Sequence, residues 1–390
     1  MPVLIIRCSP MKTPRAEITV NGRAVASLFN ERLVSVTIID KEGVSSDSIR
    51  CELNDGNPFA AIPEKGDAIT AQLGFLETGL AEFGPYTIDD PEIQCLPYKM
   101  LISGRGANIR DDAKQHRSRH WDRQSVGEIV SEIATGLGLQ ALIDSEIGAH
   151  VYEWFGQQDE SDLHVLERLA RRHDALFSIK GDRVVFARKG SGRAASGGAL
   201  TPVVATPDNI VEGTCRVTYD NRKRYRKVRA RVQDRNQAKL LELEVESDPE
   251  GAADYTMPEP FADEGEARRA AGAKARSLKS ETMRTRVTLN GDPTIRAGAS
   301  FQYRSVRPGV DSVVFIIETA THRLSKAGYV VEVDAKLKPS SDSGSDSAGS
   351  GGEGENPPAS QSAEPDGSGA GQRQPEAPPV PSLPGGIGHA

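Results

Sequence analysis

The sequence has few cysteines and no long hydrophobic run. Its four cysteines, Cys8, Cys51, Cys95 and Cys215, are far apart, and no two of them have the close spacing of zinc sites or redox motifs. We therefore expect free thiols in a reducing compartment. No apolar run approaches the roughly 18 residues of a membrane-spanning helix, and residues 1–9 are too short for a signal peptide. We expect a soluble chain made in the cytosol, with no membrane partner.

The sequence also lacks the short motifs of common catalytic sites. It has no glycine-rich phosphate loop, no His-Glu-x-x-His helix and no Gly-x-Ser-x-Gly turn. Asp89, Asp90 and Glu92 form an acidic cluster of the kind a glycosidase uses, but clustered acids on a loop are typical of solvated surface. His116 and His120 lie in a polar segment that we expect to be a basic surface bridge over residues 111–122, because no third ligand is near and the neighbouring cations oppose metal binding. We predict no catalytic residues, no cofactor and no metal site.

Hydrophobic residues are scarce as well, at 37% of 390 residues. The last stretch, residues 339–390, consists mainly of Ser, Gly, Pro, Glu and Asp and has almost nothing to bury, which predicts a disordered acidic tail. This tail holds seven acids and one base, Arg373, and so accounts for most of the formal charge of −7. The folded part is near neutral, and net charge therefore gives no indication of a nucleic-acid partner.

The clearest pattern is a small α/β unit in the middle of the chain. Ser125 followed by Glu128 has the spacing of a helix-capping box, and apolar residues then recur at helical spacing. A second helix is predicted after residues 159–162, because leucines occupy one face, acids precede it and arginines end it. Residues 176–180 and 183–187 flank a Gly-Asp pair, which predicts a tight hairpin. The order helix, helix, hairpin indicates no chemistry by itself.

Strand signals dominate on both sides of this unit. Short runs rich in β-branched residues are separated by glycine and proline turns, as in a small barrel or sandwich. An Ala-rich segment over residues 263–281 has helical spacing and interrupts the second set of strands. A weak internal repeat connects the two sets, because residues 62–69 and residues 295–301 each contain an isoleucine, a glycine turn and the start of a strand. The sequence therefore predicts two β domains of related fold.

Residues 215–232 are unusually basic. Val228, Ala230 and Val232 alternate with arginines, which predicts a strand with one apolar and one charged face. One interpretation is a groove for nucleic-acid phosphates, with Tyr219 and Tyr225 stacking on bases. The candidate interaction surface consists of Arg222, Lys223, Arg224, Arg226, Lys227, Arg229 and Arg231.

The other interpretation of this segment is a half-buried strand whose cations face solvent or an acidic neighbour. Residues 241–246 alternate with the opposite sign. Antiparallel pairing across residues 233–239 would set these acids against the bases. This second interpretation therefore predicts that residues 241–246 form the strand that pairs with the basic segment.

Three stretches, in the correct order, resemble a known family. The run Gln-Gln-Asp-Glu-Ser-Asp-Leu through Leu-Glu-Arg-Leu-Ala, residues 157–170, resembles a helix pattern of the contractile-tail hub family, in which a hairpin follows directly. Residues 289–298 and residues 318–329 resemble the closing motifs of that family. The nearest branch is the late control protein D of contractile-tailed temperate phages, which is related to the N-terminal part of the type VI secretion spike protein. The resemblance covers residues 16–338.

This resemblance implies two similar β-barrels per chain and a homotrimer, which together give a ring of six barrels. The ring would adapt a six-fold tail tube, or its initiator protein, to a trimeric spike protein at the baseplate, in contact with other baseplate proteins. The protein would reside in the virion tail and, during assembly, in the host cytoplasm, and DNA would pass through the ring without specific binding. No catalytic residues carry over, so we do not expect an enzyme.

The chain departs from the secretion-spike relatives after Lys338. It has no oligosaccharide-binding domain and no β-helical needle there, so the spike is expected to be a separate protein. The alternative function is a nucleic-acid-binding module that uses residues 222–231. The predicted parts are a first, tube-like β-barrel domain over residues 1–110, an α/β insert over 111–189, a linker over 190–199, a second β-barrel domain over 200–338 with the helix 263–281, and the tail over 339–390.

Overall fold

The computed structural model describes residues 12–24, 32–43, 47–106, 115–189, 198–234, 239–261 and 263–338. The acidic tail predicted over residues 339–390 and most of the linker predicted over residues 190–199 lie outside the described residues. In the ranges above, no helix is long and apolar enough to cross a membrane.

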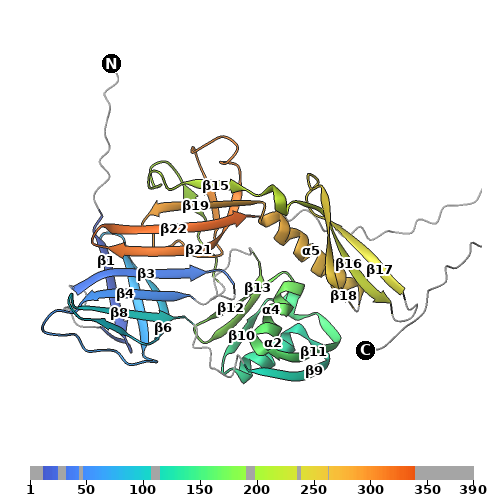
Figure 1. The fold of residues 1–390 in the computed structure, drawn as a ribbon, viewed down its shortest axis with the longest axis horizontal. Coiled ribbons are helices and arrows are strands. Elements are labelled where there is room, and N and C mark those ends of the chain that lie inside the picture. Colours follow the sequence, from blue (N-terminus) through green and yellow to red (C-terminus); the bar gives the residue numbers. More distant parts are fainter. Residues whose placement is uncertain are drawn as a thin grey trace, which may run out of the picture. The chain divides into compact units, whose positions relative to one another are not determined.

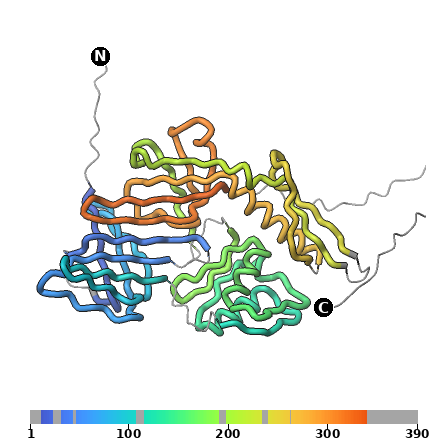
Figure 2. The backbone as a smooth tube through the Cα atoms, in the orientation of Figure 1, coloured from blue at the N-terminus to red at the C-terminus, as the bar shows by residue number. Residues whose placement is uncertain are grey.

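Most strands belong to one large sheet with the order β15-β19-β22-β21-β3-β4-β8-β6-β5-β1-β2 (Figures 1 and 2). Three strands lie off this path, since β7 pairs with β8, and β20 pairs with both β14 and β21. The strands of the first half are β1 (Pro14–Val20), β2 (Arg23–Ala24), β3 (Leu33–Lys41), β4 (Ser48–Asn54), β5 (Ala68–Phe75), β6 (Gly79–Ile88), β7 (Glu92–Gln94) and β8 (Lys99–Arg105). Those of the second half are β14 (Val203–Ala205), β15 (Arg216–Tyr219), β19 (Met283–Asn290), β20 (Ser300–Tyr303), β21 (Val314–Ser325) and β22 (Gly328–Leu337).

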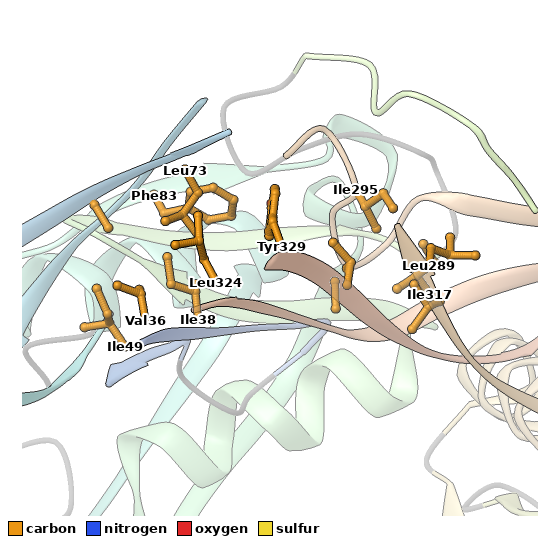
Figure 3. Close-up of a cluster of buried hydrophobic side chains, with 14 of the residues drawn as sticks. Val36, Ile38, Ile49, Leu73, Phe83, Leu289, Ile295, Ile317, Leu324 and Tyr329 are labelled. Atoms are coloured by element: carbon orange, nitrogen blue, oxygen red, sulfur yellow. The ribbon is translucent and has the colours of Figure 1, made fainter. Parts of the chain in front are cut away.

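The two halves share one hydrophobic core. The alternation that builds it is clear in β5, where Ile69, Ala71 and Leu73 are fully buried and point to the same face. Figure 3 shows side chains of both halves in one cluster, including Phe83 of the first half and Tyr329 of the second. The protein is therefore mainly β, as the sequence predicts, and its two β halves pack as one body.

A strand pair joins the two halves by backbone hydrogen bonds. β3, blue in Figure 1, runs antiparallel to β21, orange, although they are far apart in the sequence. In this pair Ile38 lies opposite His322, and both side chains are fully buried. The sequence patterns predict the two β domains but not this connection.

The α/β insert follows β8. Ser125 caps α2, and the capping box is complete because the Ser125 backbone amide donates to Glu128 Oε2 at 2.7 Å while Ser125 Oγ accepts from the Glu128 amide at 3.2 Å. The predicted second helix and hairpin are also present. The elements are β9 (His116–Ser125), α2 (Val126–Gly136), β10 (Gln140–Ile143), α3 (Ser145–Gly148), β11 (Val151–Ser161), α4 (Asp162–Arg172), β12 (Ala175–Lys180) and β13 (Arg183–Arg188).

One expectation for the insert is wrong. The polar pattern predicts a bridging segment over residues 111–122, but residues 116–125 form β9, which pairs antiparallel with β11. The strand is stabilised by contacts that its polar sequence does not indicate. Trp121 is 3% exposed, and Arg119 donates a hydrogen bond to Asp162 at 2.7 Å. Charged residues fill this strand because their partners lie on neighbouring elements.

A third small core lies in the second half, between β15 and β19. It packs α5 (Glu264–Ser280) against a sheet of β16 (Tyr225–Asp234), β17 (Lys239–Glu246) and β18 (Ala253–Phe261), in the order β17-β16-β18. The predicted helix over residues 263–281 is confirmed, with Asp263 as its N-cap. A one-turn 3-10 helix, η2 (Asn221–Lys223), precedes β16.

The two halves repeat the same strand path. The first half runs β1-β5-β6-β8-β4-β3, and the second runs β14-β20-β21-β22-β19-β15. Each strand of one path has its counterpart at the same place in the other. The outermost pair differs, because β1 is antiparallel to β5 whereas β14 is parallel to β20. The predicted similarity of the two barrels is therefore confirmed at the level of topology.

The repeat extends to individual hydrogen bonds at the turn that the sequence echo marks. The Gly66 amide donates to the carbonyl of Ile88 at 3.0 Å, and the Gly298 amide donates to that of Ile317 at 2.8 Å. Both glycines have positive φ, 95° and 85°. Ile88 and Ile317 are thus equivalent positions.

The register of the following strands is also repeated. Ile88 lies opposite Gly104 as Ile317 lies opposite Ala335. In both halves one extra residue then follows before pairing resumes, between β6 and β7 in the first half and within β21 in the second. After this bulge Ile93 of β7 lies opposite Met100, as His322 of β21 lies opposite Val331. β6 and β7 together therefore correspond to the single long strand β21.

Candidate functional site

The predicted interaction surface lies on η2 and β16, on the small sheet outside the barrels. Val228 and Ala230 are fully buried against α5, and Val232 is 5% exposed, so the apolar face of the alternation forms the third core. β17 pairs antiparallel with β16, with Arg229 opposite Glu244. The predicted half-buried strand and its acidic neighbour are both confirmed.

Most cations of this surface have a carboxylate partner nearby. Arg229 contacts both Glu244 of β17 and Asp254 of β18, at 3.0 and 2.8 Å. Arg231 instead donates to the backbone carbonyl oxygens of β18, and Arg222 has no ion pair among the described residues. The other pairs join Lys223 to Glu281, Arg224 to Asp248 and Glu250, Arg226 to Asp254, and Lys227 to Glu244 and Glu246.

These pairs change the electrostatics of the strand. The hydrogen bond between Lys227 and Glu244 raises the pKa of the lysine and lowers that of the glutamate. A cation that is already neutralised by a neighbouring carboxylate releases fewer counterions on meeting a phosphate. The geometry thus fits a self-paired charged surface better than a phosphate groove, and the interaction role of these seven residues stays a prediction.

The acidic cluster and the histidine pair do not form a chemical centre. Asp89 pairs with Arg105 and Asp90 with Lys65, and all are at the surface. His116 and His120 lie on β9, each within 3.5 Å of an aspartate, and both are exposed. The described ranges contain no group of three or more potential metal ligands.

A half-buried charge cluster connects the three parts of the fold. Lys180 of the insert reaches Asp40 Oδ1 at 3.0 Å and Asp47 Oδ2 at 2.6 Å in the first half. The second oxygen of Asp40 accepts the Ala297 amide of the second half at 3.0 Å. Burial, then the charge of Asp40, raises the pKa of Asp47 to about 6. Burial alone would lower the pKa of Lys180, but the two aspartates raise it.

Several strand edges are open among the described residues, and those of β15 and β7 are two of them. β15 ends the path of the large sheet, and β7 pairs only with β8. The three residues of β7 are exposed, and Tyr219 of β15 is 56% exposed. An open edge offers unpaired N–H and C=O groups to another chain. Sequence reasoning missed both edges, although the run Leu-Asn-Asp-Gly-Asn-Pro at residues 53–58 and Leu-Asn-Gly-Asp-Pro at 289–293 would have indicated the repeat that defines them.

The fold is that of phage and phage-like tail proteins. The tail protein of Neisseria meningitidis MC58 superposes with a TM-score of 0.61 at 13% identity, covering 83% of this chain and 96% of that one. The c3393 protein of Escherichia coli, described as a component of the type VI secretion system, superposes with a TM-score of 0.53 at 12% identity, covering 84% of this chain and 78% of that one. At these identities the likeness concerns the fold alone.

The sequence comparisons are more specific. The probable baseplate hub protein of Escherichia phage 186 is 26% identical over 365 residues, which cover 84% of this chain and 94% of that protein. The model of the family described as phage tail baseplate hub (GPD) matches residues 88–328, more than half of the chain. The chain belongs to this family of baseplate hub proteins, and its role is structural, in the baseplate of a phage-type tail.

Proposed function

We propose that three copies of this hub protein form a ring of six barrels that adapts a six-fold tail tube to a three-fold spike. The observation that carries the proposal is the repeated strand path and register of the two halves. A chain with two equivalent barrels presents six of them in a three-fold ring, and identical chains usually assemble with closed symmetry.

The partners in this proposal are a tail tube or tube-initiator protein, a separate trimeric spike protein and other baseplate proteins. Assembly takes place in the host cytoplasm, and DNA passes through the finished ring without specific binding. The hub contributes shape and symmetry rather than catalysis. Membership of the baseplate hub family supports these assignments.

The test is the oligomeric state of the purified full-length chain, alone and mixed with the tube and spike proteins of the same tail. We expect a trimer in native mass spectrometry and a three-fold ring with six lobes in electron micrographs. A chain that stays monomeric alone and with both partners overturns the proposal. A ring with a different number of lobes also overturns it.

A further inference from the structure

We propose that β15 of one copy pairs antiparallel with β7 of the next, so that Cys215 of one chain faces Cys95 of its neighbour. The inference rests on the proposed trimer, because it names the strands that join its chains. The pairing is inferred from the internal repeat. One contact between the two barrels is already present within the chain, and the equivalent strands would form the same contact between chains.

The contact within the chain is the pair β3–β21. Its register places Ile38 opposite His322 and Val36 opposite Leu324. Three of these four side chains are fully buried, and Leu324 is 8% exposed. The first barrel thus offers the edge of β3, and the second barrel accepts it along β21.

The repeat identifies the equivalent of each strand. β15 holds the place of β3, because Arg216 lies opposite Arg286 as Thr37 lies opposite Arg50. The partner strands β19 and β4 are themselves aligned, since Thr285 faces Ala335 as Ile49 faces Gly104. β7 holds the place of the part of β21 that accepts β3.

The equivalents, β15 and β7, both have an open edge. Transferring the register of β3–β21 sets Val217 opposite Ile93, in the place of Ile38 and His322. It sets Thr218 opposite Glu92 on the other face. Two residues along, Cys215, which directly precedes β15, takes the place of Val36, and Cys95, which directly follows β7, takes that of Leu324.

The side chains at these edges are those of an interface without its partner. Ile93 is 44% exposed, whereas its equivalent His322 is fully buried. Cys95 and Cys215 are exposed, whereas Val36 is fully buried. Pairing a second copy here covers the apolar positions and satisfies the backbone groups of both edges.

Charge supports the same occupant. Glu92 of β7 and Arg216 of β15 make no ion pair with any described residue of their own chain. In the transferred register they are diagonal neighbours, a separation that long side chains bridge.

The two cysteines make the register measurable. Opposed residues of antiparallel strands have Cα atoms about 4.5 to 5.5 Å apart, within the roughly 4.4–6.8 Å that a disulfide requires. Cys51 does not interfere, because it is fully buried and burial raises its thiol pKa to about 12. Cys8 lies outside the described residues and is replaced in all test proteins by Cys8→Ser.

The experiment oxidises the full-length Cys8→Ser chain with copper(II)-phenanthroline. For each disulfide formed, two copper(II) ions accept one electron each, and the two thiol protons pass to the buffer. Non-reducing gels are expected to show covalent dimers and trimers, with the Cys95–Cys215 link identified by peptide mass spectrometry. Adding Cys95→Ser or Cys215→Ser is expected to remove the link. Refolding the Cys95→Ser and Cys215→Ser variants together is expected to give disulfide-linked dimers but no disulfide-linked trimers. In each mixed trimer only one of the three contacts between chains then carries both thiols.

The outcomes separate this inference from the proposed function. A trimer in native mass spectrometry that gives no Cys95–Cys215 link overturns the strand pairing and leaves the ring standing. Cross-linking of the Cys215→Ser variant alone shows a different contact and overturns it as well. A chain that is monomeric alone and with its partners overturns both.

A second variant tests the edge without cysteine chemistry. Ile93→Asp places a charge at the centre of the proposed contact, at a side chain that is already exposed in the single chain. We expect monomers with an unchanged melting temperature at low protein concentration. Leu76→Asp makes a similar apolar-to-acid change at a 62% exposed position of the first barrel and is expected to leave the trimer intact. A trimeric Ile93→Asp protein contradicts the pairing.

Discussion

The phenol of Tyr329 donates a hydrogen bond to Nδ1 of His322 across 2.7 Å in the shared core of the two halves. The direction follows from the other ring nitrogen. Nε2 lies 3.0 Å from the carbonyl oxygen of Ile295, which can only accept, so Nε2 carries a proton, and the low pKa of the ring leaves Nδ1 unprotonated as the acceptor. Burial, then the charge of Arg296, lowers the pKa of His322 to about 4.

Removing the phenol should destabilise the fold. In Tyr329→Phe the buried Nδ1 of His322 loses its donor, and an unsatisfied buried acceptor costs about 1–3 kcal/mol. Urea unfolding at pH 7 measures the loss. Tyr98→Phe, at a 40% exposed tyrosine, is the matched control and should change the unfolding free energy little. Equal stability of the two variants would contradict this assignment.

The same histidine predicts a pH dependence. Its pKa is lower in the folded chain than the 6.5 of an unfolded one, so its contribution to stability is present above pH 6.5 and is lost as the pH falls toward 4. His322→Gln keeps a donor for Ile295 but cannot ionise. The stability advantage of the wild type over this variant should shrink by about 2 kcal/mol between pH 7 and pH 5. Unfolding curves that stay parallel across this range would exclude the mechanism.

The charge cluster at Lys180 predicts a second pH dependence, in which the advantage of the wild type again shrinks as the pH falls. Lys180→Met leaves Asp40 and Asp47 facing each other without their cation. Because the groups are half-buried, the loss should stay below the roughly 3–5 kcal/mol of breaking a fully buried pair. Asp47, with its pKa raised to about 6, binds a proton below that pH and relieves the repulsion. The loss should therefore be larger at pH 8 than at pH 5. Adding Asp47→Asn should restore part of the stability at pH 8, and a pH-independent loss would argue against the cluster.

The ion pairs of β16 predict poor binding of nucleic acid. Duplex DNA titrated at low salt should bind weakly, and the dependence of affinity on salt should be shallow, because few cations are free to release phosphate counterions. Asp254→Asn removes the carboxylate partner of Arg226 and one of the two partners of Arg229 and should strengthen binding. Tight wild-type binding that falls steeply with salt and is lost in Arg226→Ala would instead establish the nucleic-acid hypothesis.

Local signals in the sequence predicted local structure well. The capping box at Ser125, the helix beginning near Asp263 and the antiparallel match of β16 and β17 depend on neighbouring residues, whose chemistry is visible in a short window. The glycine turns at Gly66 and Gly298 likewise require a backbone conformation that few other residues adopt. The family motifs extended these local predictions to an architecture.

Long-range pairings were not predictable in the same way. β3 and β21 carry no mark of each other, because any two strands of suitable alternation can pair. β7 has three exposed residues and resembles a loop, since it pairs with a neighbouring strand on one edge only. β9 is charged because its partners, such as Asp162, come from another element.

The pairing of β3 with β21 has a consequence for the dilution behaviour of the hub. The two strands belong to one chain and meet at a fixed effective concentration, of the order of millimolar for tethered partners. Half of the barrel contacts in the proposed ring therefore persist however few copies a cell contains. Only the contacts between chains depend on protein concentration. Assembly of one proposed ring therefore requires three contacts to form between separate molecules, rather than six.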